Sequence, residues 1–280
     1  MKEIKVSKIT DMVAEACGRM AVLYPQDILH KLEVCREVET GASREAMEML
    51  VENAGIAVQE DIPICQDTGM VIAFVTIGQD VHLTDGSLKE AIDAGVRKGY
   101  TEHYLRASVV GDPLFDRINT KDNTPAVIYI DMVEGDVFHI DLLAKGFGSE
   151  NMSAVKMLKP AEGREGVKQF VLDTIAKAGP NACPPMVVGV GIGGTFDYCA
   201  VLAKKALLHG VKEKNPDPSY AELEEELVNE ANALRIGPMG LHGKTTVLNI
   251  AIESYPTHIA GLPCAVNICC HACRHERIEL

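Results

Sequence analysis

The cysteines have the most distinctive setting of any residue type in this sequence. Six of the nine lie in loops or beside glycine and proline, where backbone can approach a bulky cofactor: Cys65, Cys183, Cys264, Cys269, Cys270 and Cys273. Thiolates act as nucleophiles or bind soft metals. The gaps of over a hundred residues after Cys65 and over eighty after Cys183 match neither a compact zinc finger nor the C-x₂-C-x₂-C run of ferredoxins. Two interpretations stay open here: a widely spaced triple that converges on a cluster, and three unrelated thiols.

Cys65 has neighbours that can transfer protons and bind polar groups. It lies in the loop Asp61–Gly69 (DIPICQDTG), and Gln66, Asp67 and Thr68 follow it directly. A loop between a helical pattern and an apolar run commonly presents functional side chains, so we predict a chemically active turn. The remaining cysteines lie in helical or apolar surroundings and are interpreted as small buried hydrophobes: Cys17, Cys35 and Cys199.

Histidine and basic side chains supply a second set of candidates. His258 ends the strand-like run YPTH at a turn, where it could act as an acid, a base or a donor to a carboxylate. Four cations lie in polar or glycine-rich loops: Arg117, Lys145, Lys244 and Arg274. Solvated surface charge is the competing interpretation for each of them.

Two glycine patterns resemble phosphate-binding loops. The stretch Gly189–Gly194 fits G-x-G-x-x-G, but no second strand with a ribose-binding acid follows it. We interpret it as a tight strand-to-helix turn whose N–H groups face an anion. The stretch Gly243–Thr245 (GKT) resembles the end of a Walker A loop, but the earlier glycine of that motif would fall at Pro238. We therefore expect no nucleotide site at either position.

Helical and strand-like patterns alternate through most of the chain. Apolar residues at helical spacing predict helices over 7–24, 43–60, 85–106, 163–178, 196–209 and 220–235. Strands are predicted over 70–77, 125–133, 136–144 and 186–190, with further strand-like runs over 245–270. Glu134-Gly135 between two of the strands is a hairpin signal. The pattern predicts an α/β fold in which helices cover a mixed sheet and cysteine-bearing loops converge on one site.

Length and composition limit the class of protein. The 280 residues, 47% of them apolar, predict one large domain over 1–280 or two intimate lobes, with an edge at Asn215–Ser219 (NPDPS). A formal charge of −13 argues against nucleic acid and anionic membranes as partners. There is no membrane-length apolar run and no secretory-type N-terminus, so we expect a cytoplasmic protein, in which cysteines rarely form a disulfide framework.

Taken together, the motifs resemble the α subunit, equivalently the N-terminal domain, of the class I fumarase and L-tartrate dehydratase family of iron–sulfur hydro-lyases. The resemblance covers nearly the whole chain. It depends on five segments in order: ICQDTG at 64–69, RINTKDNTPA at 117–126, KGFGSEN at 145–151, GPNACPPMVVGVGIGGT at 179–195 and YPTHIAGLPCAVNICCHACRH at 255–275.

This resemblance implies a 4Fe-4S cluster held by three cysteines, with one iron left without a protein thiolate. The implied ligands are Cys65, Cys183 and Cys270. Three other terminal cysteines remain alternatives for the third ligand, the first being the weakest: Cys264, Cys269 and Cys273. An open iron would act as a Lewis acid on the hydroxyl group of a substrate.

The resemblance also implies which residues contact the substrate: Gln66, Asp67, Arg117, Gly148 and His258, with Lys145 as a further candidate. Asp67 and His258 are the catalytic candidates, Asp67 as a proton-transfer residue. Arg117 would clamp a carboxylate, because negative charge builds there when the proton alpha to it is removed.

Part of the implied active site is absent from this sequence. In the family, further substrate-binding residues belong to a second domain, and this sequence ends at Leu280, soon after the third cysteine motif. We therefore expect a separate β subunit and an oligomeric enzyme acting on a small dicarboxylate. The expected reaction is the reversible hydration of fumarate to (S)-malate, with L-tartrate dehydration as the alternative. A non-catalytic iron–sulfur or metal-binding redox module is the alternative of another class.

Overall fold

The structure, a computed structural model, describes residues 2–211 and 213–280 and divides into two compact units. The first unit comprises Met1–Pro25, Ala54–Phe147 and Arg274–Leu280. The second comprises Gln26–Asn53 and Gly148–Cys273. The helix α3 (Gly41–Glu60) contributes residues to both. The candidate residues are therefore distributed over two separately packed cores.

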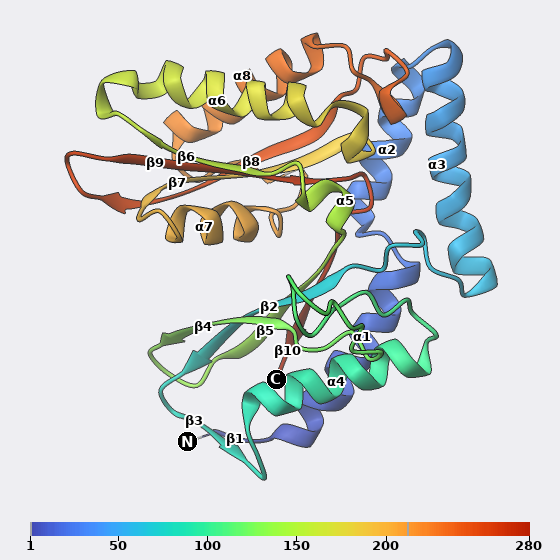
Figure 1. Cartoon of the computed structure of the whole chain (residues 1–280), viewed down its shortest axis with the longest axis vertical. Coiled ribbons are helices and arrows are strands. Elements are labelled where there is room, and N and C mark those ends of the chain that lie inside the picture. The colour runs from blue at the N-terminus through green and yellow to red at the C-terminus, as the bar shows by residue number, and fades with distance from the viewer. Residues whose placement is uncertain (1, 212) are drawn as a thin grey trace. The chain divides into compact units, whose positions relative to one another are not determined.

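The first unit is built on a four-stranded sheet in the order β10-β5-β2-β4, beside a parallel pair β1-β3. Its strands are β1 (Lys2–Lys5), β2 (Met70–Gly78), β3 (Val81–Thr84), β4 (Val127–Val133), β5 (Phe138–Lys145) and β10 (Arg274–Glu279). The helices α1 (Val6–Val22) and α4 (Leu88–Glu102) pack against each other beside this sheet (Figure 1). Alternate residues of β2 and β5 face these helices, and this period of two produces the apolar core of the unit.

The hairpin prediction at Glu134-Gly135 is wrong. β4 and β5 both pair with β2, which lies between them, parallel to β4 and antiparallel to β5. The connection passes over the end of β2, where the Gly78 N–H donates to Val137 O at 2.7 Å. β2 is a nearly continuous apolar run, and the central position buries it between two neighbours.

The second unit is built on a sheet in the order β6-β9-β7-β8. Its strands are β6 (Ala154–Leu158), β7 (Met186–Gly194), β8 (Val247–Thr257) and β9 (Leu262–Cys269). The helices α6 (Gly163–Ala178) and α8 (Pro218–Ala233) cover one face and α7 (Tyr198–Ala206) covers the other (Figure 1). The unit also contains the helix α2 (Gln26–Val38) and the short elements α5 (Phe147–Glu150), η1 (Pro160–Glu162), η2 (Gly179–Ala182) and η3 (Pro238–Gly240).

The glycine pattern at Gly189–Gly194 is not an anion-binding turn, which corrects our interpretation. Gly189 and Gly191 lie inside β7, and a Cβ on either would approach a backbone oxygen of α7 to 2.0 Å. The missing side chains therefore let α7 pack directly on the strand, because any larger residue would clash with the helix backbone.

The proline-rich segment Asn215–Ser219 lies within the second unit, and the unit boundaries fall elsewhere. Asp217 caps α8 through a hydrogen bond from the Ser219 N–H at 2.8 Å, and Pro218 occupies the first helical position. The segment thus starts α8, one of the two helices that cover this face of the sheet.

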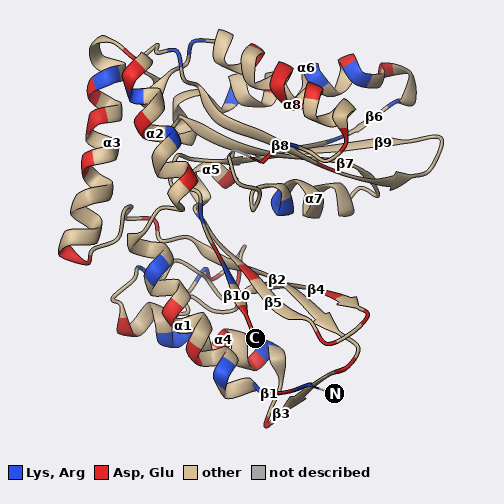
Figure 2. Cartoon of the chain, turned by 180° about the vertical axis from the view of Figure 1, so that it is seen from behind, with Lys and Arg blue, Asp and Glu red and all other residues tan. Residues whose placement is uncertain are grey.

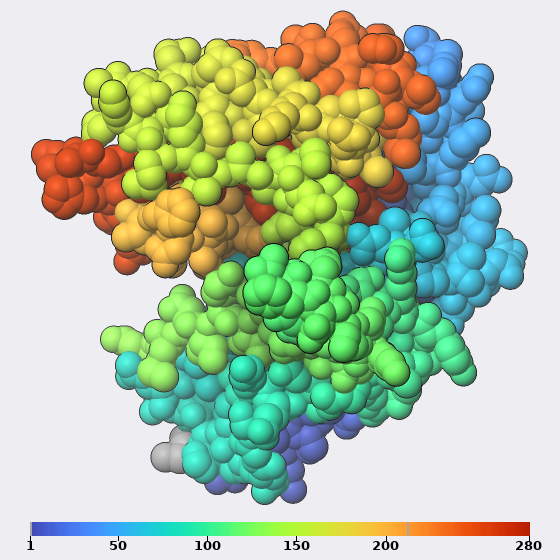
Figure 3. Space-filling model, viewed as in Figure 1, coloured from blue at the N-terminus to red at the C-terminus, as the bar shows by residue number. Residues whose placement is uncertain are grey.

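In Figure 3 the adjoining surfaces of α6 (yellow-green) and α8 (orange) form one side of this unit.

Charged residues of both signs line the outer helices. Figure 2 shows Lys and Arg interleaved with Asp and Glu along α6 and α8, and Lys168 lies 2.7 Å from Glu230 between them. Among the described residues no helix is long and apolar enough to span a membrane. The mixed sheets covered by helices confirm the predicted α/β class.

Candidate active site

The loop that carries Cys65 belongs to the first unit and connects α3 to β2. Buried Ile64 anchors it, since its N–H donates to Ala21 O at 2.9 Å and its side chain is 6% exposed. Cys65 is half-buried and Gln66 is exposed. The anchored backbone therefore presents both predicted side chains at the surface of the unit.

Asp67 fixes the turn through both carboxylate oxygens. Oδ1 accepts the Gly69 N–H and Oδ2 accepts the Phe147 N–H, each at 2.9 Å. Each oxygen retains a further lone pair. Because Asp67 is only half-buried, its carboxylate can still accept a proton or hydrogen bond from a ligand while the turn stays in place.

Two buried hydroxyl groups hold the next residues of the loop. The Thr68 hydroxyl donates to Arg106 O at 2.9 Å, and the Tyr100 hydroxyl contacts Thr68 O at 2.8 Å and Gly69 O at 3.0 Å. Burial raises the pKa of Tyr100 well above its ordinary value, so the phenol stays protonated and donates. The backbone on the C-terminal side of Asp67 is therefore rigidly placed.

Two cations are buried beside this turn. Lys145, at the end of β5, has 0% exposure and its Nζ donates to Gly146 O at 2.9 Å. Arg274, the first residue of β10, has 1% exposure and its Nη2 donates to Asp67 O at 2.7 Å. Solvated surface charge, the competing interpretation for both, is wrong. The structure brings Asp67 together with one predicted substrate residue, Lys145, and with Arg274, which lay outside the predicted site.

Arg117 and Arg106 have different relations to the turn. Arg117 is exposed, has a left-handed backbone (φ 47°), and donates through Nη1 to Pro113 O within its own loop. Arg106 is exposed too, but its backbone accepts the Thr68 hydroxyl. Sequence reasoning missed Arg106, although it closes the predicted helix 85–106 and so lies where a loop begins.

Cys183 and Cys270 come from neighbouring segments of the second unit. The His271 N–H donates to Cys183 O at 3.3 Å. Cys183 precedes β7 and Cys270 follows β9, and these strands are antiparallel, with Val187 opposite Cys269. Cys183 is exposed and has a left-handed backbone (φ 49°), and Cys270 is half-buried. Two accessible thiols thus lie at one end of this sheet.

The other terminal cysteines have different surroundings. Cys264 is fully buried in the apolar core, and burial raises its pKa to about 12. Cys269 is 1% exposed within β9, and Cys273 is fully buried with its Sγ 3.7 Å from Leu207 O. Cys270 is the terminal cysteine with the most accessible side chain. The three alternatives therefore behave as core residues of this unit.

His258 lies at the opposite end of the same sheet. It follows β8, which runs parallel to β7 with Thr257 opposite Gly194. Cys183 precedes the other end of β7, and the strand Met186–Gly194 spans roughly 26 Å at about 3.3 Å per residue. His258 lines a separate cavity of about 600 Å³. The structure does not bring this predicted catalytic residue together with the two thiols of its own chain.

Gly148 is the second residue of the short helix α5. A Cβ built on it meets no heavy atom within 4 Å, so its backbone is open to a ligand. Gly148 is the first residue of the segment Gly148–Cys273, the larger of the two segments of the second unit. Lys145 belongs to the first unit.

The GKT stretch binds an anion that belongs to the protein itself. The buried Glu39 carboxylate accepts the Lys244 N–H at 2.8 Å and the Thr245 N–H at 2.6 Å. Burial alone would raise the pKa of Glu39, but these N–H groups outweigh it and lower the pKa. The exclusion of a phosphate loop is supported, because Glu39 occupies the donors.

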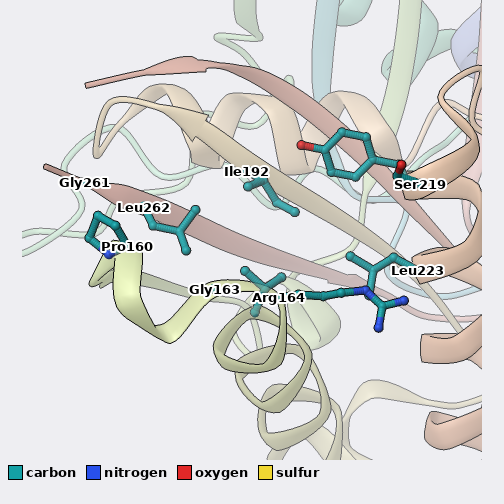
Figure 4. Close-up of a pocket in the computed structure, with 10 residues that line it drawn as sticks. Pro160, Gly163, Arg164, Ile192, Ser219, Leu223, Gly261 and Leu262 are labelled. Atoms are coloured by element: carbon teal, nitrogen blue, oxygen red, sulfur yellow. The ribbon is translucent and has the colours of Figure 1, made fainter. Parts of the chain in front are cut away.

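An apolar cavity of about 380 Å³ in the second unit contains none of the predicted site residues. Figure 4 shows Ile192, Leu223 and Leu262 lining it, with Arg164 of α6 at its side. The Arg164 guanidinium already lies 2.9 Å from Glu226. The cavity lacks thiols, histidines and free acids for the chemistry considered above.

The residues fit an iron–sulfur group by the chemistry of their donors. Cys65 in the first unit and Cys183 and Cys270 in the second are the accessible thiols in loops. Within each unit as described, no three His, Cys, Asp or Glu side chains gather to hold a single metal ion. Cysteine thiolates are the ligands that hold iron–sulfur clusters, so each of the three thiols has the donor chemistry that such a group needs.

An α/β protein that presents thiols and a carboxylate from loops, with buried cations at the ends of neighbouring strands, has the parts of an acid–base enzyme. The chain belongs to the fumarate hydratase (Fumerase) family, whose model matches residues 10–279. This confirms the family resemblance and the expectation of a hydro-lyase.

Relatives share almost the whole length of the chain. A protein of Methanocaldococcus jannaschii, provisionally named L(+)-tartrate dehydratase subunit alpha, is 43% identical over 98% of both chains. L(+)-tartrate dehydratase subunit alpha of Escherichia coli strain UTI89 is 34% identical over 100% of this chain and 93% of its own. The protein of that name from Shigella boydii serotype 4 is 34% identical over 98% and 91%.

Proposed function

We propose that this chain is the α subunit of an iron–sulfur hydro-lyase that dehydrates L(+)-tartrate. The observation that carries the proposal is the full-length similarity to proteins of that name. Fumarate hydration, our first expectation from the sequence, becomes the second candidate, and the description of the matching family favours it. Both reactions make or break a C–O bond next to a carbon that bears a carboxylate.

The proposed cluster ligands are Cys65, Cys183 and Cys270. The accessibility of these thiols supports the choice, as does the burial of Cys264. When bound, a cluster with one iron free of protein thiolate would supply a Lewis acid that polarises the substrate hydroxyl.

Asp67 is the proposed proton-transfer group of this chain. In dehydration, the proton alpha to one carboxylate leaves its carbon, the electron pair forms the double bond, and hydroxide leaves the neighbouring carbon as water after taking up a proton. The remaining lone pairs on Asp67 can accept that first proton, and the N–H groups of Gly69 and Phe147 keep its oxygens oriented. Gln66 on the exposed side of the turn would bind the substrate, as would the open backbone of Gly148.

Cations must offset the charge that builds on the substrate carboxylate. Lys145 is the predicted cation that is buried, and its Nζ donates to the carbonyl of Gly146 beside the Asp67 turn. Arg106 and Arg117 are the two proposed clamps, and the Thr68–Arg106 hydrogen bond favours Arg106.

His258 acts, in this proposal, in the site of a second copy of the chain. Its position at the far end of the sheet from Cys183 and Cys270 supports this assignment. The expected oligomer would then contain at least two α chains, together with the β subunit that the names of the relatives indicate.

The test is anaerobic reconstitution of the chain with its β subunit, followed by assays with L(+)-tartrate, (S)-malate and fumarate. We expect the highest kcat/KM with tartrate. Turnover of malate and fumarate without tartrate turnover would favour the second candidate. A cluster whose spectrum no dicarboxylate perturbs, even in the complex, would instead indicate a redox module.

A further inference from the structure

Arg274 is a buried guanidinium whose hydrogen-bonding capacity the described protein does not fill. It is 1% exposed, and Nη2 donates to Asp67 O at 2.7 Å. Nε and Nη1 are buried and have no hydrogen-bond partner among the described residues. A buried ionised group is costly unless it is paired, so these two donors favour an acceptor that the described residues do not supply.

The charges around Arg274 favour an anion as that acceptor. In the first unit, a Cβ on Gly146 would lie 3.2 Å from Asp67 Oδ2 and 4.0 Å from Arg274 Nη2, so the three residues are adjacent. Lys145, also fully buried, precedes Gly146 and donates to its carbonyl. Arg274 thus lies beside a half-buried carboxylate whose oxygens already bind two N–H groups, and Asp67 offers Nε and Nη1 no acceptor. The positive charge of the guanidinium therefore favours an anion at these two nitrogens.

We propose that Arg274 Nε and Nη1 form an anion-binding site of the active centre, a role that rests on the proposed function. The ligand would be an anionic acceptor, either a carboxylate of the dicarboxylate substrate or a sulfur of the cluster. One guanidinium would hold the Asp67 turn through Nη2 and the anion through its other nitrogens, so anion binding and the position of Asp67 are coupled. A lysine has one nitrogen and cannot hold both from the same place.

Variants of the α chain in complex with its β subunit, prepared anaerobically, test the site. Arg274→Gln removes the charge and Arg274→Lys keeps it. Arg277→Gln is the matched control, because Arg277 lies on the same strand but pairs with Asp141 at the surface. Three quantities are measured: iron and sulfide per chain, the dissociation constant of tartrate from the cluster spectrum, and the thermal unfolding midpoint.

Expected results separate the two sources of the anion. If it is the substrate carboxylate, Arg274→Gln keeps its iron and sulfide but binds tartrate about 10- to 100-fold more weakly, the range for a lost charged hydrogen bond. If it is a cluster sulfur, Arg274→Gln retains less iron and sulfide than Arg277→Gln. Arg274→Lys should be intermediate. Full iron with unchanged tartrate affinity in Arg274→Gln would overturn the proposal.

If the Arg274 variants fail to fold, a measurement on the wild-type chain still tests the site. Without cluster, tartrate or sulfate should raise the unfolding midpoint of the chain at constant ionic strength, because an anion that binds only the folded state stabilises it. No stabilisation by either anion, together with unfolded Arg274 variants, would overturn the site. Failure of the wild-type complex to assemble a cluster would refute the proposed function, whereas a loaded wild type with an unaffected Arg274→Gln refutes only this inference.

Discussion

Complementation between two inactive variants tests whether His258 acts in the active site of another copy of the chain. The perturbations are His258→Ala and Cys270→Ser, on separate α chains that are mixed and assembled with the β subunit. The structure supplies the reason: β7 separates the end that carries Cys183 from the end near His258 by roughly 26 Å. A side chain reaches a fraction of that distance.

The expected magnitude follows from random pairing. In an α dimer, about half of the assemblies contain one copy of each variant, and each of these has about one intact site out of two. Activity should therefore rise from near zero in each parent to about a quarter of the wild-type value. The assay is the initial rate of tartrate or malate dehydration, under anaerobic conditions and after equilibration of the mixed chains.

Two controls give the result its meaning. A double variant with both substitutions on one chain, mixed one to one with wild type, should leave about a quarter of the wild-type activity, because a dimer of one wild-type and one double-variant chain has no intact site. Action within one chain would leave about half. Iron and sulfide analysis must show that His258→Ala retains its cluster. A mixture no more active than its parents, with His258→Ala itself inactive, would refute action across copies. An active His258→Ala would remove this residue from catalysis.

Four further predictions concern single features of the chain. Cys270→Ser should lose most of its iron and sulfide after reconstitution, whereas Cys264→Ser should retain both; equal loss would contradict the ligand assignment. Arg106→Ala should raise KM for the dicarboxylate about 10- to 100-fold, and more than Arg117→Ala does; the reverse order would make Arg117 the clamp. Air should abolish activity and leave the fold intact, as judged by circular dichroism; an air-stable, iron-independent enzyme would refute the mechanism. Glu39→Gln should lower the free energy of unfolding by roughly 2 to 4 kcal/mol in urea, because two N–H donors lose a charged acceptor. Since the pKa of Glu39 is lowered from 4.5 in the folded state, its stabilisation is present above that value and is lost as pH falls through the folded-state pKa. Below about pH 4.5 the wild type should therefore lose stability more steeply than the variant, and parallel slopes would contradict the role of Glu39.

The periodic elements were predictable because their burial patterns repeat within a few residues. The helix over 7–24 appears as α1, the strand over 70–77 as β2, and the helix over 163–178 as α6. α2 was missed, although its three buried residues Ile28, Leu32 and Cys35 have helical spacing, because the apolar face they form is narrow and the rest of the helix is more exposed. The pairing of β2 with β4 and β5 was also beyond reach, because a turn signal at Glu134-Gly135 reports local geometry and not which strand lies between its neighbours.

In the candidate site, too, only the residues that are close together in the sequence could be predicted from it. Cys65, Gln66 and Asp67 are consecutive, so their shared turn was visible in the sequence. The approach of Cys183 to Cys270 depends on antiparallel pairing across more than eighty residues, and only the resemblance to a family indicated it. Spacing alone allowed unrelated thiols equally well.

Arg274 shows why the sequence could not complete the site. Four residues after Cys270 it looked like one more solvated cation, since an arginine in a polar stretch is usually exposed. Its burial arises because β10 pairs with β5 and brings the guanidinium against Asp67, over two hundred residues earlier. Nothing local to Arg274 encodes that contact, or the lack of an acceptor for Nε and Nη1 among the described residues. A folded protein tolerates a buried, unpaired guanidinium where a bound ligand offsets its charge. Arg274 was therefore the hardest residue of the site to predict from the sequence, and it is also the residue that indicates an anionic ligand.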